Sequence, residues 1–227
     1  MLLSLADLAA LAFFLAVWTG HSLATEGRFF SRASLSTAMN RQREAWMRTM
    51  ARRELRMIDT SIMQGLQQGT AFFGSSALIA IGGCFALLGS SDQVLNVLGD
   101  LPLSQAASRP LFEVKVIGLA LILAYSFFKF GWSYRLFNYC SILIGAVPLR
   151  DDPGASREID IAVERAARMN VLAGKHFNAG MRGIFFSIGY LGWFLGPVVF
   201  AVTTLLILAV LVRRQFFSQA RRSVVDA

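Results

Sequence analysis

The sequence predicts an all-α integral membrane protein, in which four long transmembrane helices form a bundle with a cytoplasmic helical extension. Three observations lead to this fold class. The chain of 227 residues is 55% hydrophobic and only 16% charged, an apolar fraction above that of ordinary globular domains. Four apolar stretches are each long enough to cross a hydrocarbon core of about 30 Å as a helix. The basic residues, mostly arginine, are concentrated in the segments that join these stretches.

The four predicted spans cover residues 2–20, 66–88, 111–133 and 184–212. No Lys or Arg precedes Arg28, and a secretory signal peptide would carry a basic region before its apolar core. We therefore expect the first span to be a retained helix. Cytoplasmic helical segments are expected over residues 37–65, 134–147 and 156–182. Residues 1–212 then form a single transmembrane bundle, followed by a basic tail over residues 213–227.

The basic residues also predict the orientation of the spans. Segment 19–65 contains eight arginines, which are Arg28, Arg32, Arg41, Arg43, Arg48, Arg52, Arg53 and Arg56. Segment 149–182 contains Arg150, Arg157, Arg165, Arg168, Lys175 and Arg182, whereas segment 89–110 contains Arg109 alone. Because basic connections stay in the cytoplasm, the two rich segments are placed inside and both termini outside. The arginines of the tail disagree with this layout, since they favour the inside.

The third apolar stretch is too long for one crossing. Apolar character resumes after Lys129 and continues to Val147, about 37 residues in all. Either one long helix projects beyond the bilayer, or the stretch makes two short crossings. Residues 128–134 contain no pair of residues typical of a tight turn, which favours one long helix. The layout with five crossings stays open, and it would move the tail inside.

Helical periodicity continues in the cytoplasmic segments. Apolar residues at intervals of three or four predict one helical face that runs without a breaker into the second span, namely Met47, Ala51, Leu55, Ile58, Ile62 and Leu66. A weaker inner stripe in the later segment consists of Ile159, Val163, Ala166, Asn170, Ala173 and Phe177. These faces predict that the membrane bundle continues into the cytoplasm.

Small residues within the spans predict close helix packing. Gly192 and Gly196 have the four-residue spacing that lets helices approach in lipid, and Pro197 should kink the fourth span by removing a backbone donor. The predicted packing residues are Gly65, Gly69, Gly74, Gly192, Gly196 and Pro197. We expect packing within the chain, with a homodimer contact or a ligand groove as alternatives.

Two polar and aromatic clusters lie where spans meet the cytoplasm. Their candidate site residues are Lys129, Trp132, Arg135, Asn138, Lys175, His176, Asn178 and Arg182. The ordinary interpretation is an anchoring belt at the membrane interface. The sharper hypothesis is a cytoplasmic-side pocket or partner surface, in which Arg135 and Arg182 present guanidinium groups to an anion.

Catalytic and metal-binding signals are weak. The sequence contains no HExxH, CxxC, GxSxG or P-loop pattern. The two histidines, His21 and His176, could meet Glu26 at the inner face, which would be needed for a metal site or a membrane-embedded enzyme. The ordinary interpretation is two interfacial histidines. Cys84 and Cys140 fall near opposite sides of the membrane, so we expect no disulfide, and we expect neither a metal nor another cofactor.

Four segments resemble a known family of bacterial multi-span membrane proteins. They are Ile58–Phe73 (IDTSIMQGLQQGTAFF), Trp132–Tyr139 (WSYRLFNY) and His176–Arg182 (HFNAGMR) with Gly189–Trp193 (GYLGW). The chain resembles the domain-of-unknown-function family number 599 over most of its length. The resemblance implies a helical integral membrane protein, and it implies no activity, substrate or catalytic residue.

The functional expectation is therefore a non-enzymatic protein of the bacterial inner (cytoplasmic) membrane, with a structural or accessory role. Its expected partners are the lipid bilayer, with anionic headgroups near Arg48, Arg52 and Arg56, and other membrane proteins or a second copy of the chain, but not nucleic acid. The alternative is a channel or transporter for a small neutral or anionic solute. That alternative would be favoured by a continuous polar groove at the level of Gln64, Gln67, Gln68 and Thr70.

Overall fold

The computed structural model describes residues 3–26, 33–99, 108–149 and 156–225, and every regular element within these ranges is helical. In chain order the elements are α1 (Leu5–Thr25), α2 (Leu35–Met50), α3 (Met57–Gly89), α4 (Ser91–Gly99), α5 (Arg109–Gly145), α6 (Ser156–Tyr190), the 3-10 helix η1 (Leu191–Phe194), α7 (Pro197–Phe216) and α8 (Gln219–Val225). The predicted all-α fold is confirmed. Arg28, Arg32 and Arg150, which contribute to the predicted basic segments, lie outside the described residues.

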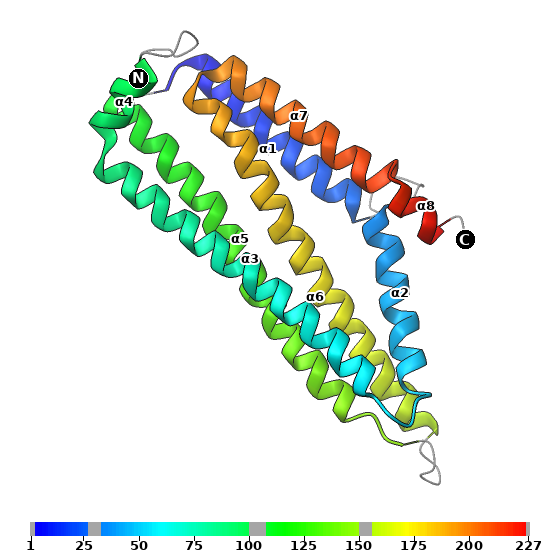
Figure 1. Ribbon diagram of the computed structural model, residues 1–227. Helices are drawn as coiled ribbons and strands as arrows, with labels where there is room; N and C mark the ends of the chain where they lie inside the picture. The colour runs from blue at the N-terminus through cyan, green and yellow to red at the C-terminus, as the bar shows by residue number, and fades with distance from the viewer. Residues whose placement is uncertain (1–2, 27–32, 100–107, 150–155, 226–227) are drawn as a thin grey trace.

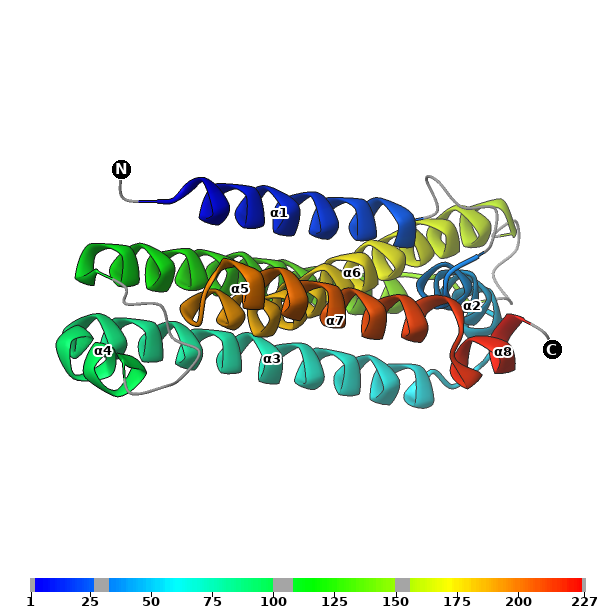
Figure 2. The same ribbon diagram turned by 90° about the horizontal axis from the view of Figure 1, so that it is seen from above.

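Three long helices, α3, α5 and α6, run the length of an elongated bundle (Figure 1). α1 and α7 lie along the C-terminal half of α6, and α2 packs against its N-terminal half. Figure 2 shows α4 and the N-terminus at one end of the bundle and α8 with the C-terminus toward the other. One end of the bundle therefore contains α4 and the turn between α6 and α7, and the other end extends past the C-terminal ends of α1 and α7.

Four helical segments are long and apolar enough to cross a membrane, namely Leu5–Thr25, Met57–Gly89, Arg109–Gly145 and Pro197–Val225. Large apolar side chains cover their outer faces, and Ile79 and Phe128 are 76% and 72% exposed. Continuous apolar surface of this kind is unfavourable in water and expected in lipid. The structure thus agrees with the predicted bundle of membrane-crossing helices.

The third apolar stretch forms a single helix. α5 has 37 residues without interruption, so the segment predicted over residues 134–147 is the continuation of the third span. The prediction of one long helix is confirmed. Since α5 contains no turn, the alternative in which this stretch crosses twice is wrong.

The fourth predicted span, residues 184–212, is not one helix. α6 ends at Tyr190, and α7 begins at Pro197 and runs back beside it (Figure 1). Gly196 has a φ of 137°, which glycine tolerates because it has no Cβ. Pro197 is the first residue of α7, where its missing N–H removes no helical hydrogen bond. The Gly-Pro pair reverses the chain, whereas the sequence predicted a kink.

The C-terminal half of α6 runs antiparallel to α1. The Arg182 guanidinium lies 3.4 Å from the Thr25 hydroxyl in the last turn of α1. The Trp193 indole, just after α6, donates to the Asp7 carboxylate in the first turn of α1 over 2.7 Å. Residues 183–194 between these contacts carry no charged side chain. A membrane that contains α1 and α7 therefore also contains this part of α6.

The tail lies beside the start of α2. The Arg221 Nε donates to the Ala33 carbonyl over 2.9 Å, and the backbone N–H of Ser36 donates to the Gln215 side chain over 3.2 Å. The C-terminus is thus on the same side as α2, and the predicted placement of the tail opposite the first basic segment is wrong. The reason is the reversal at Gly196, after which α7 runs back to the α2 end of the bundle. With the tail at that end, its arginines no longer conflict with the charge rule.

The predicted continuous helix from residue 37 into the second span is also wrong. α2 ends at Met50 and α3 begins at Met57, so the expected apolar face is interrupted and Leu55 is exposed. The buried Asp59 carboxylate accepts from the Trp46 indole at 2.7 Å and from Arg53 at 2.5 Å. Arg56 donates to the Ile144, Val147 and Pro148 carbonyls at the end of α5, which offsets the negative end of that helix.

Two apolar clusters fill the bundle. The first is rich in aromatic residues and joins α1, α3, α5, α6 and α7, and the second joins α2, α3, α5 and α6. The predicted inner stripe of α6 is confirmed for its central residues, since Val163, Ala166, Asn170 and Ala173 are buried. Cys84 and Cys140 belong to different clusters and are free thiols.

The predicted packing glycines have different environments. Gly192 faces Thr203 on α7 so closely that a Cβ there would lie 2.2 Å from the Thr203 hydroxyl. Gly74 lies against Phe130 on α5, and a Cβ added at Gly74 would be 3.6 Å from the Cβ of Phe130. Gly65 and Gly69 face open space on α3, so the prediction that they pack within the chain is wrong. They lie on the face of α3 that turns away from α5.

Candidate functional site

A polar pocket of about 210 Å³ lies where α1 ends and α2 packs on α6. Three helices contribute to it, and its lining residues are Thr25, Glu26, Ser36, Thr37, Asn40, Arg41, Glu44, Val171, Lys175, Asn178 and Arg182. The pocket thus lies at the end of α1 that is next to α2, where the membrane-crossing part of the bundle gives way to its extension.

Arg182 is the buried cation of this polar pocket. Its side chain is only 10% exposed, and its hydrogen bonds to the Thr25 hydroxyl and the Glu26 carboxylate are 3.4 and 3.5 Å long. Charge-assisted bonds are usually about 2.8 Å. The Nε of Arg182 has no hydrogen-bond partner among the described residues. A buried guanidinium with such long hydrogen bonds is well suited to bind a further anionic group.

The remaining charges of the polar pocket are mixed. Arg41 and Lys175 are exposed cations, and they line the polar pocket together with the carboxylates of Glu26 and Glu44. With Arg182, the lining therefore has three cations and two carboxylates. Asn178 donates to the Ser36 hydroxyl over 3.4 Å, which links α6 to α2 at the pocket wall.

The position of α2 depends on a second arginine. The Arg43 guanidinium donates to the buried Asn170 side chain on α6 over 2.7 Å and lies over the Phe137 ring, 5.7 Å from its centroid. Burial lowers the pKa of Arg43 below its ordinary value. Gly174 leaves room for this side chain, because a Cβ at that position would lie 2.8 Å from the Arg43 Nε. These contacts fix the α2 wall of the polar pocket.

The structure brings together three of the eight candidate site residues, Lys175, Asn178 and Arg182. His176 lies on another side of α6, with its ring centroid 6.4 Å from that of Trp132. On α5, Arg135 donates to the Tyr139 hydroxyl over 2.6 Å. Trp132, Arg135 and His176 do not line the polar pocket.

The other two members of the α5 cluster also lie outside the polar pocket. Lys129 lies over the Tyr125 ring, 5.3 Å from its centroid, and Asn138 is half-buried on the same helix. The cluster on α5 therefore has the character of a surface belt. Arg135 and Arg182 were predicted to bind the same anion, but Arg135 lies beside Tyr139 on α5 and only Arg182 lines the polar pocket.

The histidines do not converge with Glu26. His21 lies between α1 and α7 in a different, apolar pocket, His176 lies beside Trp132, and Glu26 belongs to the polar pocket. Within the described ranges, no group of three or more His, Cys, Asp or Glu side chains could hold a metal ion. His21, His176 and Glu26 therefore do not form the joint site that a membrane-embedded enzyme would have needed from them.

The glutamines of α3 do not form a shared groove. Gln64 and Gln68 are exposed, while Gln67 donates to the Ser141 hydroxyl on α5 over 3.0 Å. The Thr70 hydroxyl is bonded to the Leu66 carbonyl of its own helix. Two of these four side chains are exposed on the outer surface of α3 and the other two are hydrogen-bonded to α5 or to α3 itself, so they give no support to a solute path at this level.

A family comparison agrees with this architecture. The model of the family described as "Protein of unknown function, DUF599" matches residues 9–220, which include every residue of the polar pocket. The chain belongs to the DUF599 family. This DUF599 chain matches none of the curated proteins and none of the solved structures with which it was compared. The family gives a membership but no activity, so the function must be argued from the site.

Sequence reasoning missed the α2 side of this DUF599 pocket, which consists of Ser36, Thr37, Asn40, Arg41 and Glu44. A signal was present, because Ser34 caps the helix by accepting from the backbone N–H of Thr37 and a serine before a periodic segment indicates a helix start. Which face of α2 meets α6 could not be predicted, since that depends on the turn after Met50.

Proposed function

We propose that the protein is a non-enzymatic, multi-pass protein of the bacterial inner membrane that binds an anionic group of another membrane component in its polar pocket. The anionic group is a carboxylate or a phosphate. The role is accessory: the pocket holds a partner molecule or a protein side chain at the cytoplasmic boundary of the membrane.

Arg182 carries this proposal. Its guanidinium is buried, its two existing bonds are long, and one of its N–H groups has no partner among the described residues. Removing a charged group from water is unfavourable unless its hydrogen bonds are satisfied. An incoming carboxylate or phosphate would satisfy the guanidinium in the planar geometry that arginine favours.

The volume of the polar pocket also supports a small group. Sites for whole small molecules usually measure about 300–1,000 Å³, and this pocket measures about 210 Å³. Lys175 and Arg41 at its rim add positive charge that would draw an anion toward Arg182. A partner's anionic group fits this space better than an entire metabolite.

The inner-membrane location rests on charge. With α2 and α8 on one side, most arginines of the chain share that side, and the charge rule makes it the cytoplasm. The headgroup contact of Arg48 and Arg52 stays a prediction, because both side chains are exposed. The charge of Arg56 is instead used at the end of α5.

The test uses the full chain, purified in a mild detergent, with inorganic phosphate as the probe. At about ten times its Kd, a ligand stabilises the native state by about 1.4 kcal/mol, which raises the midpoint of thermal unfolding by about 4 °C. We expect this rise for the wild type relative to chloride at equal ionic strength. Arg182→Gln should abolish it.

Arg168→Gln is the matched control, because Arg168 lies on the same helix but is exposed and paired with Glu164. It should keep the response to phosphate. Co-purification of partners in mild detergent, identified by mass spectrometry, should likewise depend on Arg182 and not on Arg168. Equal phosphate responses of both variants, with unchanged helical content, would contradict the proposal.

A further inference from the structure

A second pocket lies between α1 and α7 and differs in character from the polar pocket. It measures about 490 Å³ and is almost entirely apolar, with Gly20, His21, Ala24, Leu208, Val212, Phe216 and Phe217 as its lining residues. α1 and α7 run in the same direction (Figure 1). The middle of α1 meets the first turn of α7, where the Phe14 and Phe200 ring centroids are 5.1 Å apart. This α1–α7 pocket lies between their C-terminal halves.

Small side chains on α1 create the space. Gly20 and Ala24 are one helical turn apart, so they share a face, and opposite them on α7 are Leu208 and Val212. A Cβ at Gly20 would meet nothing within 4 Å. The remaining walls are aliphatic or aromatic carbon, which suits a hydrocarbon chain and no polar ligand.

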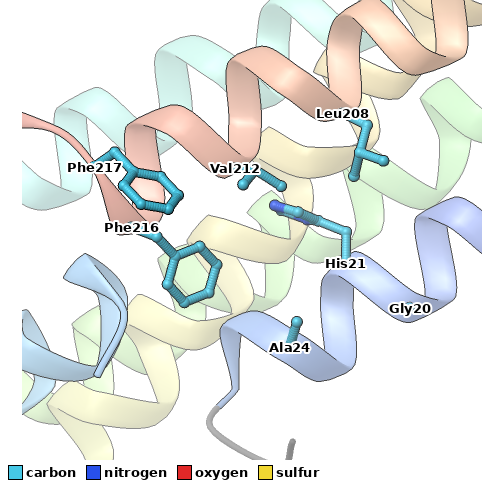
Figure 3. A pocket seen from close by; sticks show the side chains of 7 residues that line it. All are labelled: Gly20, His21, Ala24, Leu208, Val212, Phe216 and Phe217. Carbon is cyan, nitrogen blue, oxygen red and sulfur yellow. The ribbon is translucent and has the colours of Figure 1, made fainter. Parts of the chain in front are cut away.

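His21 is the exception to this apolar lining. Its side chain points from α1 across the α1–α7 pocket toward Val212 (Figure 3), and it is only 4% exposed. Neither ring nitrogen has a hydrogen-bond partner among the described residues. An imidazole carries at least one N–H donor in either protonation state. A buried donor without a partner is costly, so its direction into a pocket points to a ligand with an acceptor there.

The depth of His21 indicates what that acceptor is. His21 precedes the last residue of α1 by four positions, which corresponds to about 6 Å along the helix axis. It thus lies just inside the membrane boundary, at the level where a phospholipid has its ester carbonyls. The exposed side chains of Arg213 and Arg214 follow Val212 directly, at the level of the phosphate, where they favour an anionic lipid.

We infer that the α1–α7 pocket binds one acyl chain of an anionic phospholipid, whose ester carbonyl accepts a hydrogen bond from His21. The lipid is held more tightly than the surrounding bilayer lipid because His21 gains a hydrogen-bond partner, which it does not have among the described residues. This inference is independent of the polar pocket and of the proposed function.

The experiment compares two lipids that differ only in the acceptor. The full chain in mild detergent is incubated with an equimolar mixture of diester phosphatidylglycerol and its diether analogue, and bound lipid is measured by native mass spectrometry. We expect the wild type to retain the diester about fivefold over the diether, the size of one net hydrogen bond. His21→Leu should retain lipid but lose the preference, and His21→Gln, which keeps a donor, should restore part of it.

Gly20→Leu places a side chain in the α1–α7 pocket and should lower total bound lipid. Gly82→Leu is its matched control, because Gly82 on α3 is also a membrane glycine with open space around it, and it should behave as the wild type. The inference is overturned if the wild type shows no ester preference, if His21→Leu keeps it, or if Gly20→Leu and Gly82→Leu retain equal amounts of lipid. Retention of an isoprenoid quinone in preference to phospholipid would also overturn it.

Discussion

The indole N–H of Trp193 donates a hydrogen bond to the carboxylate of Asp7 over 2.7 Å, with both side chains buried. The Trp193 carbonyl in turn accepts from the Lys115 ammonium over 2.7 Å. These contacts join the start of α1, the start of α5 and the turn between α6 and α7. Asp7 and Lys115 are therefore ends of one buried network, which explains how an acid and a base are accommodated close to apolar spans.

Trp193→Phe is expected to destabilise the protein. The phenyl ring keeps the apolar contact with Phe200 but leaves Asp7 without its indole donor, which costs about 2 kcal/mol for a bond to a charged group. Unfolding of the purified protein in mixed micelles measures this change. Trp132→Phe is the control, because Trp132 is half exposed on α5, and it should change stability little. A larger loss in Trp132→Phe would contradict the role of the Asp7 bond.

Asp59→Ala is expected to loosen the turn between α2 and α3. Asp59 is fully buried and accepts from Trp46 and Arg53, so its removal leaves the Trp46 indole N–H unpaired at a cost of about 1–3 kcal/mol. Limited trypsin digestion should then cleave faster after Arg52 and Arg53. Asp160→Ala, at an exposed position on α6, should leave the digestion unchanged. Equal cleavage rates for the wild type and Asp59→Ala would show that the turn is held by other contacts.

Gly192→Ala is expected to disturb the hairpin of α6 and α7. The new Cβ would lie 2.2 Å from the Thr203 hydroxyl and 3.0 Å from the Val199 carbonyl oxygen, so the two helices must separate at a cost of about 1–3 kcal/mol. Gly82→Ala meets nothing within 4 Å and should be neutral or slightly stabilising, since alanine favours a helix. Comparison of the two unfolding midpoints tests this difference. It is contradicted if both substitutions have the same effect.

The side of the tail can be tested with single cysteines. Arg52→Cys and Arg222→Cys should react on the same side of the membrane with an impermeant maleimide, and Asp92→Cys on the other side. The expected order follows from the contact of Arg221 with Ala33 before α2 and from the position of α4 at the opposite end of the bundle (Figure 2). Cys84 and Cys140 are buried and provide a low background. Labelling of Arg222→Cys on the same side as Asp92→Cys would contradict the arrangement in which the tail lies on the α2 side of the membrane.

Hydropathy predicted the helices that face lipid over their whole length but not the reversal inside an apolar run. Residues 184–212 have no charged side chain between their ends, so an average over them gives no boundary. The turn at Gly196 is itself apolar, and the one signal for it is the Gly-Pro pair, which is typical of turns. A helix kink and a reversal have the same local sequence, and only the packing of Gly192 against α7 distinguishes them.

The break before α3 and half of the site depend on contacts that are distant in sequence. Residues 51–56 contain neither Gly nor Pro, and the chain turns there because Arg56 and Asp59 find partners on other segments. Lys175, Asn178 and Arg182 were predictable as polar residues beside a span. Arg41 and Glu44 reach the same pocket only because Arg43 docks α2 against Asn170, which no local pattern reveals.

The uninterrupted course of α5 has a mechanical consequence. A helix of 37 residues is about 55 Å long, nearly twice the thickness of the hydrocarbon core. A continuous helix does not bend freely at the membrane surface. A tilt of α5 at the Lys115 end therefore also moves its C-terminal end, where Arg56 donates hydrogen bonds to the last carbonyls. Because helix tilt depends on bilayer thickness, a partner bound to the protruding part of α5 would change position when the bilayer becomes thinner or thicker.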